Sequence, residues 1–130
     1  MSRRRIVFRA DRYIIGLYPV RKVPLRYRMI YLRTILAAAR AAKDCGEVWQ
    51  CRSSFRTYTE QLALYQAYKN GTGNLAAVPG TSRHEKGNAL DLGGPNNEDI
   101  GTSAMRRGAL ERRGFVFAVR GEPWHVEFKR

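Results

Sequence analysis

The chain has 130 residues, which fits one domain, and 24 Lys and Arg against 11 Asp and Glu give a formal net charge of +13. With 44% hydrophobic residues the chain can bury a core, so it is not a disordered tail. No apolar run approaches the roughly 18 residues that a membrane-spanning helix needs, and 2 cysteines are too few for a disulfide-built scaffold. The charge makes nucleic acid the first partner to consider.

The positive charge is concentrated at the two ends of the chain. Residues 1–34 carry ten basic residues and one acidic, residues 35–105 carry seven of each, and residues 106–130 carry seven basic and three acidic. The middle of the chain therefore has no net charge, while the first segment has +9 and the last has +4. Charge and chemistry can be separate questions in this protein.

The N-terminal segment does not resemble a secretory signal, because charged residues from Arg9 onward interrupt the apolar stretch 6–8. We therefore expect the protein to accumulate in the cytoplasm where it is made. In that reducing compartment Cys45 and Cys51 are expected to be free thiols, although their spacing of six residues leaves a local disulfide open. Residues 1–24 form a basic segment to which the sequence assigns no role.

The first half of the chain predicts strand, helix and strand. Residues 6–20 alternate loosely between apolar and charged residues and predict one or two short strands. Apolar residues then recur at helical spacing from Tyr27 to Lys43, and Gly46 follows as a stop, which predicts a helix. Residues 47–55 predict a strand, because apolar residues stand among polar ones.

The second half begins with a helix whose N-terminus is marked by a capping box. Thr57 and Glu60 stand at the required spacing, and the helix is predicted to run to about Lys69. Residues 71–88 are rich in Gly, Pro, Ser, Thr and Asn, and a loop of that length in a small domain is usually functional.

The remaining elements are short. They are a strand over 89–92, a turn-rich loop over 93–101, a helix over 102–113 capped by Thr102 or Ser103, and a hairpin of strands 115–119 and 124–128. This order predicts a single α+β domain over residues 1–130, with a small antiparallel β-sheet packed against helices.

Both histidines of the chain lie beside a carboxylate and a turn. His84 precedes Glu85, and His125 follows the turn that contains Glu122. Two histidines and one carboxylate can form a catalytic zinc site that leaves a fourth position for water. The His84–Glu85 pair is not the start of an HExxH motif, because Asn88 stands where the second histidine would be. We therefore expect Glu85 to be a solvated loop residue.

Two sequence blocks carry a resemblance to a known family. The first reads S-x-H-x-x-G-x-A-x-D over residues 82–91, and the second reads E-x-W-H over residues 122–125. Together they resemble the zinc D-Ala-D-Ala carboxypeptidase family (VanY-like). That family includes vancomycin-resistance D,D-peptidases and bacteriophage L-alanoyl-D-glutamate endolysins, within the wider group shared with LytM and hedgehog domains. An upstream F-R-T-x-x-x-Q over residues 55–61 resembles the family's arginine-bearing segment.

The resemblance implies a role for each matched residue, and a hedgehog/D,D-peptidase-like zinc fold to hold them. His84, Asp91 and His125 would bind one Zn²⁺ ion. Glu122 would be the catalytic base, and Arg56 would hold a carboxylate or carbonyl of the substrate. The remaining two, Ser82 and Gln61, would be lesser binding or supporting residues.

The chemistry of these residue types agrees with the implied roles. Zinc lowers the pKa of a bound water to about 7, and a carboxylate within hydrogen-bond reach can take the water proton and pass it to the leaving amine. Asp91 lies in a strand on the face opposite its leucine neighbours, where a metal explains a carboxylate. Glu127 shares a face with His125 and could orient it, although a solvated position is the expectation.

The sequence therefore predicts a zinc-dependent peptidase of peptidoglycan stem peptides, either an endolysin-type L-alanoyl-D-glutamate endopeptidase or a D-alanyl-D-alanine carboxypeptidase. A wall enzyme without an export signal suits a phage lysin that reaches the wall after the membrane is breached. Its basic ends would attract the anionic wall or envelope. We expect a monomer without a membrane span or a specific nucleic-acid partner. The alternative is a basic nucleic-acid-binding or virion-associated zinc module without hydrolytic activity.

Overall fold

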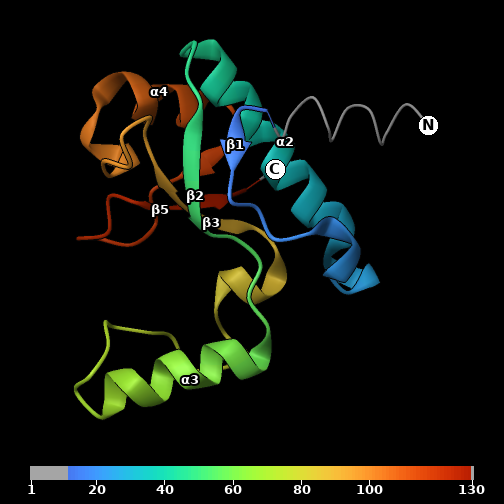
Figure 1. Ribbon diagram of the computed structural model, residues 1–130, viewed down its shortest axis with the longest axis vertical. Coiled ribbons are helices and arrows are strands. Elements are labelled where there is room, and N and C mark those ends of the chain that lie inside the picture. The colour runs from blue at the N-terminus through green and yellow to red at the C-terminus, as the bar shows by residue number, and fades with distance from the viewer. Residues whose placement is uncertain (1–11, 130) are drawn as a thin grey trace.

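A computed structural model describes residues 12–129 of the chain (Figure 1). The helices are α2 (Leu25–Asp44), α3 (Tyr58–Lys69) and α4 (Ala104–Arg112), with short 3₁₀ turns η1 (Val20–Lys22), η2 (Arg83–Lys86) and η3 (Ile100–Thr102). The strands are β1 (Ile14–Ile15), β2 (Trp49–Ser53), β3 (Ala89–Gly93), β4 (Phe115–Val116) and β5 (His125–Phe128). Within the stretch 6–20, which predicts one or two short strands, β1 is the strand found, and residues 6–11 lie outside the described residues.

The five strands form one sheet in the order β1-β2-β3-β5-β4. All pairs are antiparallel except β1 with β2, which run parallel, so the sheet is mixed. This arrangement confirms the predicted α+β class and the predicted hairpin of the last two strands. Strand β3 lies at the centre of the sheet and pairs Asp91 with His125 of β5. Two of the predicted metal ligands are thereby brought opposite each other.

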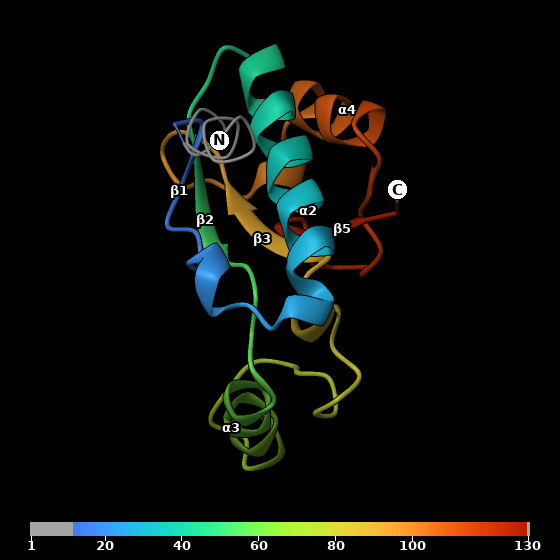
Figure 2. The same cartoon turned by 90° about the vertical axis from the view of Figure 1, so that its right-hand side faces the viewer.

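Helix α2 covers one face of the sheet (Figure 2). Its buried side chains are eight: Tyr31, Thr34, Ile35, Ala37, Ala38, Ala39, Ala41 and Ala42. Five of these are alanines, and they form one apolar core with Trp49, Leu90 and Leu92 of the sheet, which are fully buried. The helix therefore contributes the main apolar layer of the core, as its periodicity predicts.

Strand β2 contains an irregularity near the end that leads to α3. Cys51 pairs with Leu92, but Ser53 pairs with Asp91, so that one residue of β2 is additional relative to β3. Such a β-bulge bends a strand and re-aims the side chains that follow it. Beyond the bulge the chain leaves the sheet, and residues 53–56 run toward α3 beside the predicted metal ligands.

Helix α3 stands at one end of the molecule, apart from the layer formed by α2 and the sheet (Figures 1 and 2). It begins at the predicted capping box, in which Thr57 Oγ1 accepts from the Glu60 amide and the Glu60 carboxylate accepts from the Thr57 amide. Only one side chain of this helix is buried, and it is the polar Gln61. The loop that follows α3 returns to the sheet through η2, a turn that the loop prediction over 71–88 did not contain.

Two further sequence predictions can be compared with the described residues. Cys45 and Cys51 are both free, as expected, and burial together with the nearby Asp91 raises the pKa of Cys51 to about 12. Among residues 12–129, no helix combines the length and the apolar character needed to cross a membrane.

Candidate metal centre

Three side chains converge at the end of the sheet that faces α3. His84 comes from η2, Asp91 from the middle of β3, and His125 from the start of β5. Their ligand atoms all lie within 4.8 Å of one another. The Asp91 Oδ1 atom lies 3.2 Å from His84 Nε2 and 3.1 Å from His125 Nδ1. The structure therefore brings together all three residues that the sequence predicts as metal ligands.

In each imidazole, the ring nitrogen that points away from Asp91 faces a hydrogen-bond acceptor. This contact determines which of the two ring nitrogens is available to a metal. His84 Nδ1 lies 2.8 Å from the Ser54 carbonyl oxygen, and His125 Nε2 lies 2.9 Å from Glu127 Oε2. A ring N–H that donates to such an acceptor leaves the lone pair on the other nitrogen. His84 Nε2 and His125 Nδ1 are the two nitrogens that point toward Asp91.

The electrostatics of the cluster favour a cation. Burial alone raises the pKa of Asp91, but hydrogen bonds with His125 and His84 outweigh it and hold that pKa well below its usual range. Burial lowers the pKa of His125, but its hydrogen bonds with Asp91 and Glu127 outweigh this effect and raise it. A carboxylate kept anionic between two imidazoles fits a divalent metal such as zinc, with three protein ligands and an open fourth position.

Arg56 lies beside this cluster, in the segment that joins β2 to α3. Its Nη1 donates to Gln61 Oε1 at 2.8 Å, and its Nη2 donates to Ser53 Oγ at 2.8 Å. Its Nη2 is also 3.6 Å from Asp91 Oδ2. The Arg56 side chain is only 17% exposed, so its guanidinium is held in place at the edge of the metal cluster rather than free in solvent.

Gln61 and Ser82, predicted as lesser binding or supporting residues, both lie in the wall of the site. Gln61 is 1% exposed, and its Nε2 donates to the Ala77 carbonyl oxygen at 2.9 Å while its Oε1 accepts from Arg56. The Ser82 hydroxyl accepts from the His84 amide and so caps η2. Their contacts fit supporting roles, with Gln61 connecting Arg56 to the loop after α3.

Glu122, the predicted base, lies in the turn before β5 and is half-buried. Its backbone carbonyl accepts from the His125 amide at 3.1 Å, which ties this turn to the third ligand. Within the described residues, its carboxylate makes no hydrogen bond or ion pair. The side chain lines the same cavity as the ligands and is free to meet a substrate or a water there.

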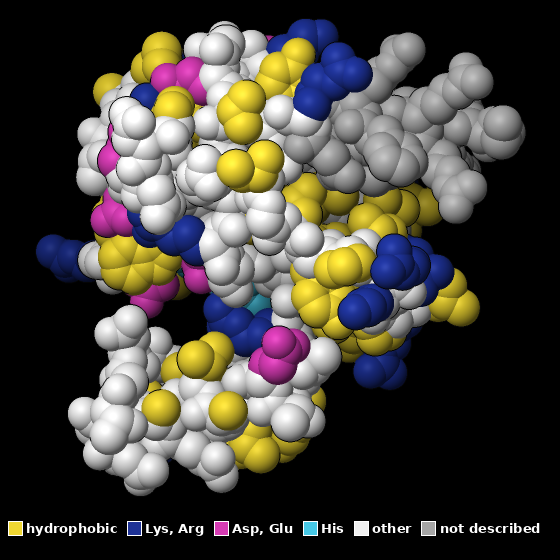
Figure 3. All heavy atoms as spheres, in the orientation of Figure 1, with side chains coloured by type: hydrophobic (Ala, Val, Ile, Leu, Met, Phe, Trp, Pro, Cys, Tyr) yellow, Lys and Arg dark blue, Asp and Glu magenta, His cyan; other side chains and the backbone are white. Residues whose placement is uncertain are grey.

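A cleft of about 780 Å³ contains the whole constellation. One wall is formed by α3 and the loop after it, including Leu64, Ala67 and Leu75, and the other by the turn with Glu122 and Trp124. Figure 3 shows the hollow between the body of the molecule and α3, with basic and histidine side chains visible at its floor. A cleft of this size can hold several residues of an extended ligand.

Two glutamates are buried where the sequence prediction expected them to be solvated. Glu85 is 7% exposed, and its carboxylate accepts hydrogen bonds from the amides of Gly80 and Ser82. Glu127 is 8% exposed and contacts His125 Nε2 and Lys129 Nζ. Both predictions are wrong because backbone amides or a histidine compensate each buried carboxylate. Glu85 holds the loop before η2, and Glu127 fixes the orientation of the His125 ring.

Comparison with known proteins provides the family. The model of VanY, D-alanyl-D-alanine carboxypeptidase, matches residues 27–113, two thirds of the chain. A search of curated proteins finds no significant match. Similar solved structures include the LD-carboxypeptidase LdcB (TM-score 0.64, 20% identity), VanYB in complex with D-alanine-D-alanine (0.51, 25%) and the L-Ala D-Glu endopeptidase ChiX of Serratia marcescens (0.53, 14%).

The extent of these matches differs. The LdcB match covers 91% of this chain and 65% of that chain, the VanYB match 68% and 63%, and the ChiX match 81% and 87%. This chain thus spans slightly less than two thirds of the LdcB and VanYB chains. The likeness to LdcB and ChiX confirms the fold, and the VanY match contains Arg56, His84 and Asp91. The chain belongs to the VanY D-alanyl-D-alanine carboxypeptidase family of peptidases.

Proposed function

We propose that this chain is a zinc-dependent peptidase that hydrolyses peptide bonds in the stem peptides of peptidoglycan. The observation that carries the proposal is the set of three ligand atoms of His84, Asp91 and His125, within 4.8 Å of one another in a cleft that also contains Glu122 and Arg56. This is the combination that hydrolysis requires, because it provides a metal site, a carboxylate without a partner among the described residues, and a fixed cation.

The metal would supply Lewis-acid activation of a water and of the scissile carbonyl. Glu122 takes a proton from the attacking water, whose oxygen forms a bond to the carbonyl carbon. When the C–N bond breaks, Glu122 returns the proton to the leaving amine, so that one acid and one amine are produced. Arg56, held by Gln61 and Ser53, binds a carboxylate or carbonyl of the substrate and aligns the peptide.

Two bonds remain as candidates for the reaction. The solved structures most relevant to them are VanYB, which holds D-alanine-D-alanine, and ChiX, an L-Ala D-Glu endopeptidase. We propose that this chain cuts either the D-alanyl-D-alanine bond as a carboxypeptidase or the L-alanyl-D-glutamate bond as an endopeptidase. The phage lysin role and the action after lysis stay predictions from the sequence.

The test is digestion of purified peptidoglycan, with the released fragments identified by mass spectrometry. The wild-type protein should trim or cleave stem peptides, lose activity with a chelator and regain it with zinc. Glu122→Gln should keep the metal and lower kcat by about 10²–10⁴-fold, because it removes the general base. Wild-type rates in Glu122→Gln, or no stem-peptide product from metal-loaded wild type, would contradict the proposal.

The basic surface supports a second part of the proposal, attraction to the anionic wall. Arg26, Arg33 and Arg40 recur every seven residues and are exposed along one face of α2. None of the three pairs with a carboxylate in the described part of the chain, and residues 12–43 contain no Asp or Glu. Unpaired arginines on one helix face produce a field that attracts phosphate and carboxylate groups.

Binding to isolated cell walls at increasing salt tests this surface. Replacing Arg26, Arg33 and Arg40 with Gln should reduce wall binding and weaken its dependence on salt. The matched control replaces Lys69, Arg112 and Arg120, which are exposed and have no carboxylate partner among the described residues, with Gln and removes the same charge elsewhere. Equal losses in the two triple variants would mean that net charge, not the α2 face, directs binding. Tighter binding to DNA than to walls would favour the nucleic-acid alternative.

A further inference from the structure

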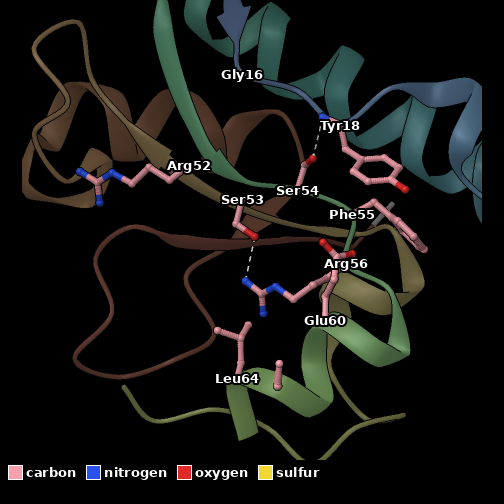
Figure 4. A pocket seen from close by; sticks show the side chains of 10 residues that line it. Gly16, Tyr18, Arg52, Ser53, Ser54, Phe55, Arg56, Glu60 and Leu64 are labelled. Carbon is pink, nitrogen blue, oxygen red and sulfur yellow. Dashed lines mark hydrogen bonds between the residues drawn. The ribbon is translucent and has the colours of Figure 1, made fainter. Parts of the chain in front are cut away.

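A second groove lies beside the metal cleft, between the start of the described chain and α3. It encloses about 510 Å³ and is lined by Gly16, Tyr18, Arg52, Ser53, Ser54, Phe55, Arg56, Glu60, Ala63 and Leu64. Figure 4 shows these side chains around an open floor, with Arg56 reaching across to Ser53. None of the predicted metal ligands lines this groove, so the metal site does not account for it.

The second groove adjoins the metal cleft along a shared boundary. Arg56 and Leu64 line both cavities. The Arg56 guanidinium is held at this boundary by Gln61 on the cleft side and by Ser53 on the groove side. A ligand that occupies the metal cleft can therefore continue past Arg56 into the second groove, provided that it is long enough.

The charged groups of the second groove are largely compensated. Arg52 donates to Asp99 at 2.6 Å and also contacts Asn97, and Arg56 Nη2 lies 3.6 Å from Asp91 Oδ2. The Glu60 carboxylate accepts from the Thr57 amide within the helix cap. The carboxylate of Glu60 in the lining, and those of Asp99 and Asp91 beside the two arginines, disfavour a strongly anionic ligand here. A neutral ligand can bind in this groove without displacing either arginine from its carboxylate partner.

The uncompensated part of the lining combines apolar surface with a hydroxyl. Leu64 is 43% exposed, and Ala63 is exposed on the same helix. Tyr18 is half-buried, with its ring against Phe55 at a centroid distance of 5.4 Å, and its hydroxyl has no hydrogen-bond partner among the described residues. An aromatic face with nearby hydroxyl groups suits a neutral ring that has both C–H faces and hydroxyls.

We propose that the second groove binds an N-acetylated amino sugar of the glycan to which the stem peptide is attached. This inference rests on the proposed function, because peptidoglycan is the polymer that joins such sugars to peptides. The groove would then make the protein prefer glycan-linked stem peptides over free ones. Tyr18, Ala63 and Leu64 would be specificity-determining residues, and Arg56 would connect the sugar site to the metal cleft.

The first experiment fills the groove from an exposed position. Ala63→Trp places a bulky side chain in the second groove, whereas Gln66→Trp is a matched control on an exposed part of α3 that lines neither cavity. For each protein, kcat/KM is measured on a glycan-linked muropeptide and on the same stem peptide without sugar. Ala63→Trp should lower the ratio of the two values by about tenfold, and Gln66→Trp should leave it unchanged.

The second experiment measures binding without hydrolysis. The disaccharide of N-acetylglucosamine and N-acetylmuramic acid, with its lactyl carboxyl as the primary amide in place of the stem peptide, is titrated into the full chain, and the backbone amide signals are followed by NMR. We expect shifts at Tyr18 and Ala63 that Ala63→Trp abolishes and Gln66→Trp preserves. Tyr18→Phe, which keeps the ring, should weaken binding without abolishing it.

The possible results separate the two proposals. No hydrolysis of either substrate would contradict the proposed function, while the disaccharide titration would still decide the sugar site. Hydrolysis with an unchanged substrate ratio in Ala63→Trp and no disaccharide shifts would overturn the sugar site alone. Shifts at Tyr18 and Ala63 caused by free stem peptide, and not by the disaccharide, would assign the groove to peptide and would also overturn it.

Discussion

Helices α2 and α3 show two different ways in which a helix serves this molecule. Eight side chains of α2 are buried, five of them alanines that belong to the same apolar core as the buried side chains of the sheet. In α3 the single buried side chain is Gln61, an amide whose contacts are Arg56 and the Ala77 carbonyl. One helix is held by apolar burial over its length, and the other by a polar contact at the candidate site.

This difference indicates a division of tasks between the two helices. The layer of α2 and the sheet supplies the free energy of folding, since apolar burial is its dominant favourable term. Helix α3 adds little buried apolar surface but lines both cavities. We infer that substitutions on α2 affect stability first, and that substitutions on α3 affect ligand contacts first.

The largest effect is expected from removing apolar volume on the α2 side. Ile35 is 1% exposed, so Ile35→Ala should reduce the free energy of unfolding by about 2–5 kcal/mol. Leu64 on α3 is 43% exposed, and Leu64→Ala should change it by no more than about 0.5 kcal/mol. Urea unfolding followed by circular dichroism measures both. Similar losses in the two variants would remove the distinction between the helices.

A smaller effect is expected at Gln61, the one buried contact of α3. Gln61→Ala leaves the Ala77 carbonyl and one Arg56 donor without their partner, and because both groups line a cleft that water can enter, the loss should be about 0.5–1.5 kcal/mol. Hydrogen exchange should increase in α3 and residues 72–82 more than in α2. Gln66→Ala is the exposed control on the same helix. Uniform exchange changes over both helices would show that α3 is not held separately.

Substitution of Glu127, whose carboxylate contacts His125 Nε2, should weaken metal binding and leave the fold nearly intact. Glu127→Ala removes the acceptor at His125 Nε2, and loss of such a partner lowers metal affinity by about 10–100-fold. Competition with a chromogenic chelator measures the affinity, and Glu127→Gln should recover part of it. Lys129→Ala removes only the other partner of Glu127 and serves as the control. Unchanged zinc affinity in Glu127→Ala would exclude this orienting role.

The smallest effect is expected at a polar contact of the α2 side, and it should depend on pH. The Glu47 carboxylate accepts from Arg106 Nε at 2.7 Å and from the Trp49 indole at 2.9 Å. The hydrogen bond from Arg106 lowers the pKa of Glu47, so the stabilisation is complete above the unfolded-state pKa of about 4.3 and is lost as the pH falls through the lowered pKa.

Arg106→Ala should therefore reduce the free energy of unfolding by about 1 kcal/mol at pH 7. The difference from wild type should shrink as the solution is acidified below pH about 4. Arg40→Ala removes a cation without a partner in the described part of the chain and should change little. A difference that grows toward acid pH would contradict the sign of this linkage, and urea titrations at several pH values measure it.

The sequence predicts those parts of the structure that depend on neighbours in the chain. The capping box of Thr57 and Glu60 and the period of α2 are local signals, and the structure contains both. Ser82 and Glu85 stand at the same spacing as that capping box and also form one, so the burial of Glu85 had a signal that the loop composition obscured.

Other features depend on contacts between distant segments and have no local signal. The Ser54 carbonyl faces His84 across thirty residues, and Gln61 reaches Ala77 across sixteen. The position of Ser54 also depends on its hydroxyl, which accepts from the Tyr31 hydroxyl of α2. A sequence pattern can name the histidines, but only the folded chain determines which carbonyl and which hydroxyl orient them.

The irregular pairing of β2 has a consequence for anyone who would transplant this centre to another protein. The regular half of β2 could be replaced by any strand that fits the sheet, but residues 53–56 obtain their direction from the one additional residue before them. A graft that copied the three predicted ligands but made β2 a regular strand would place neither the Ser54 carbonyl at His84 nor Arg56 at Asp91. A graft would therefore have to include the predicted ligands together with the additional residue of β2 between Cys51 and Ser53.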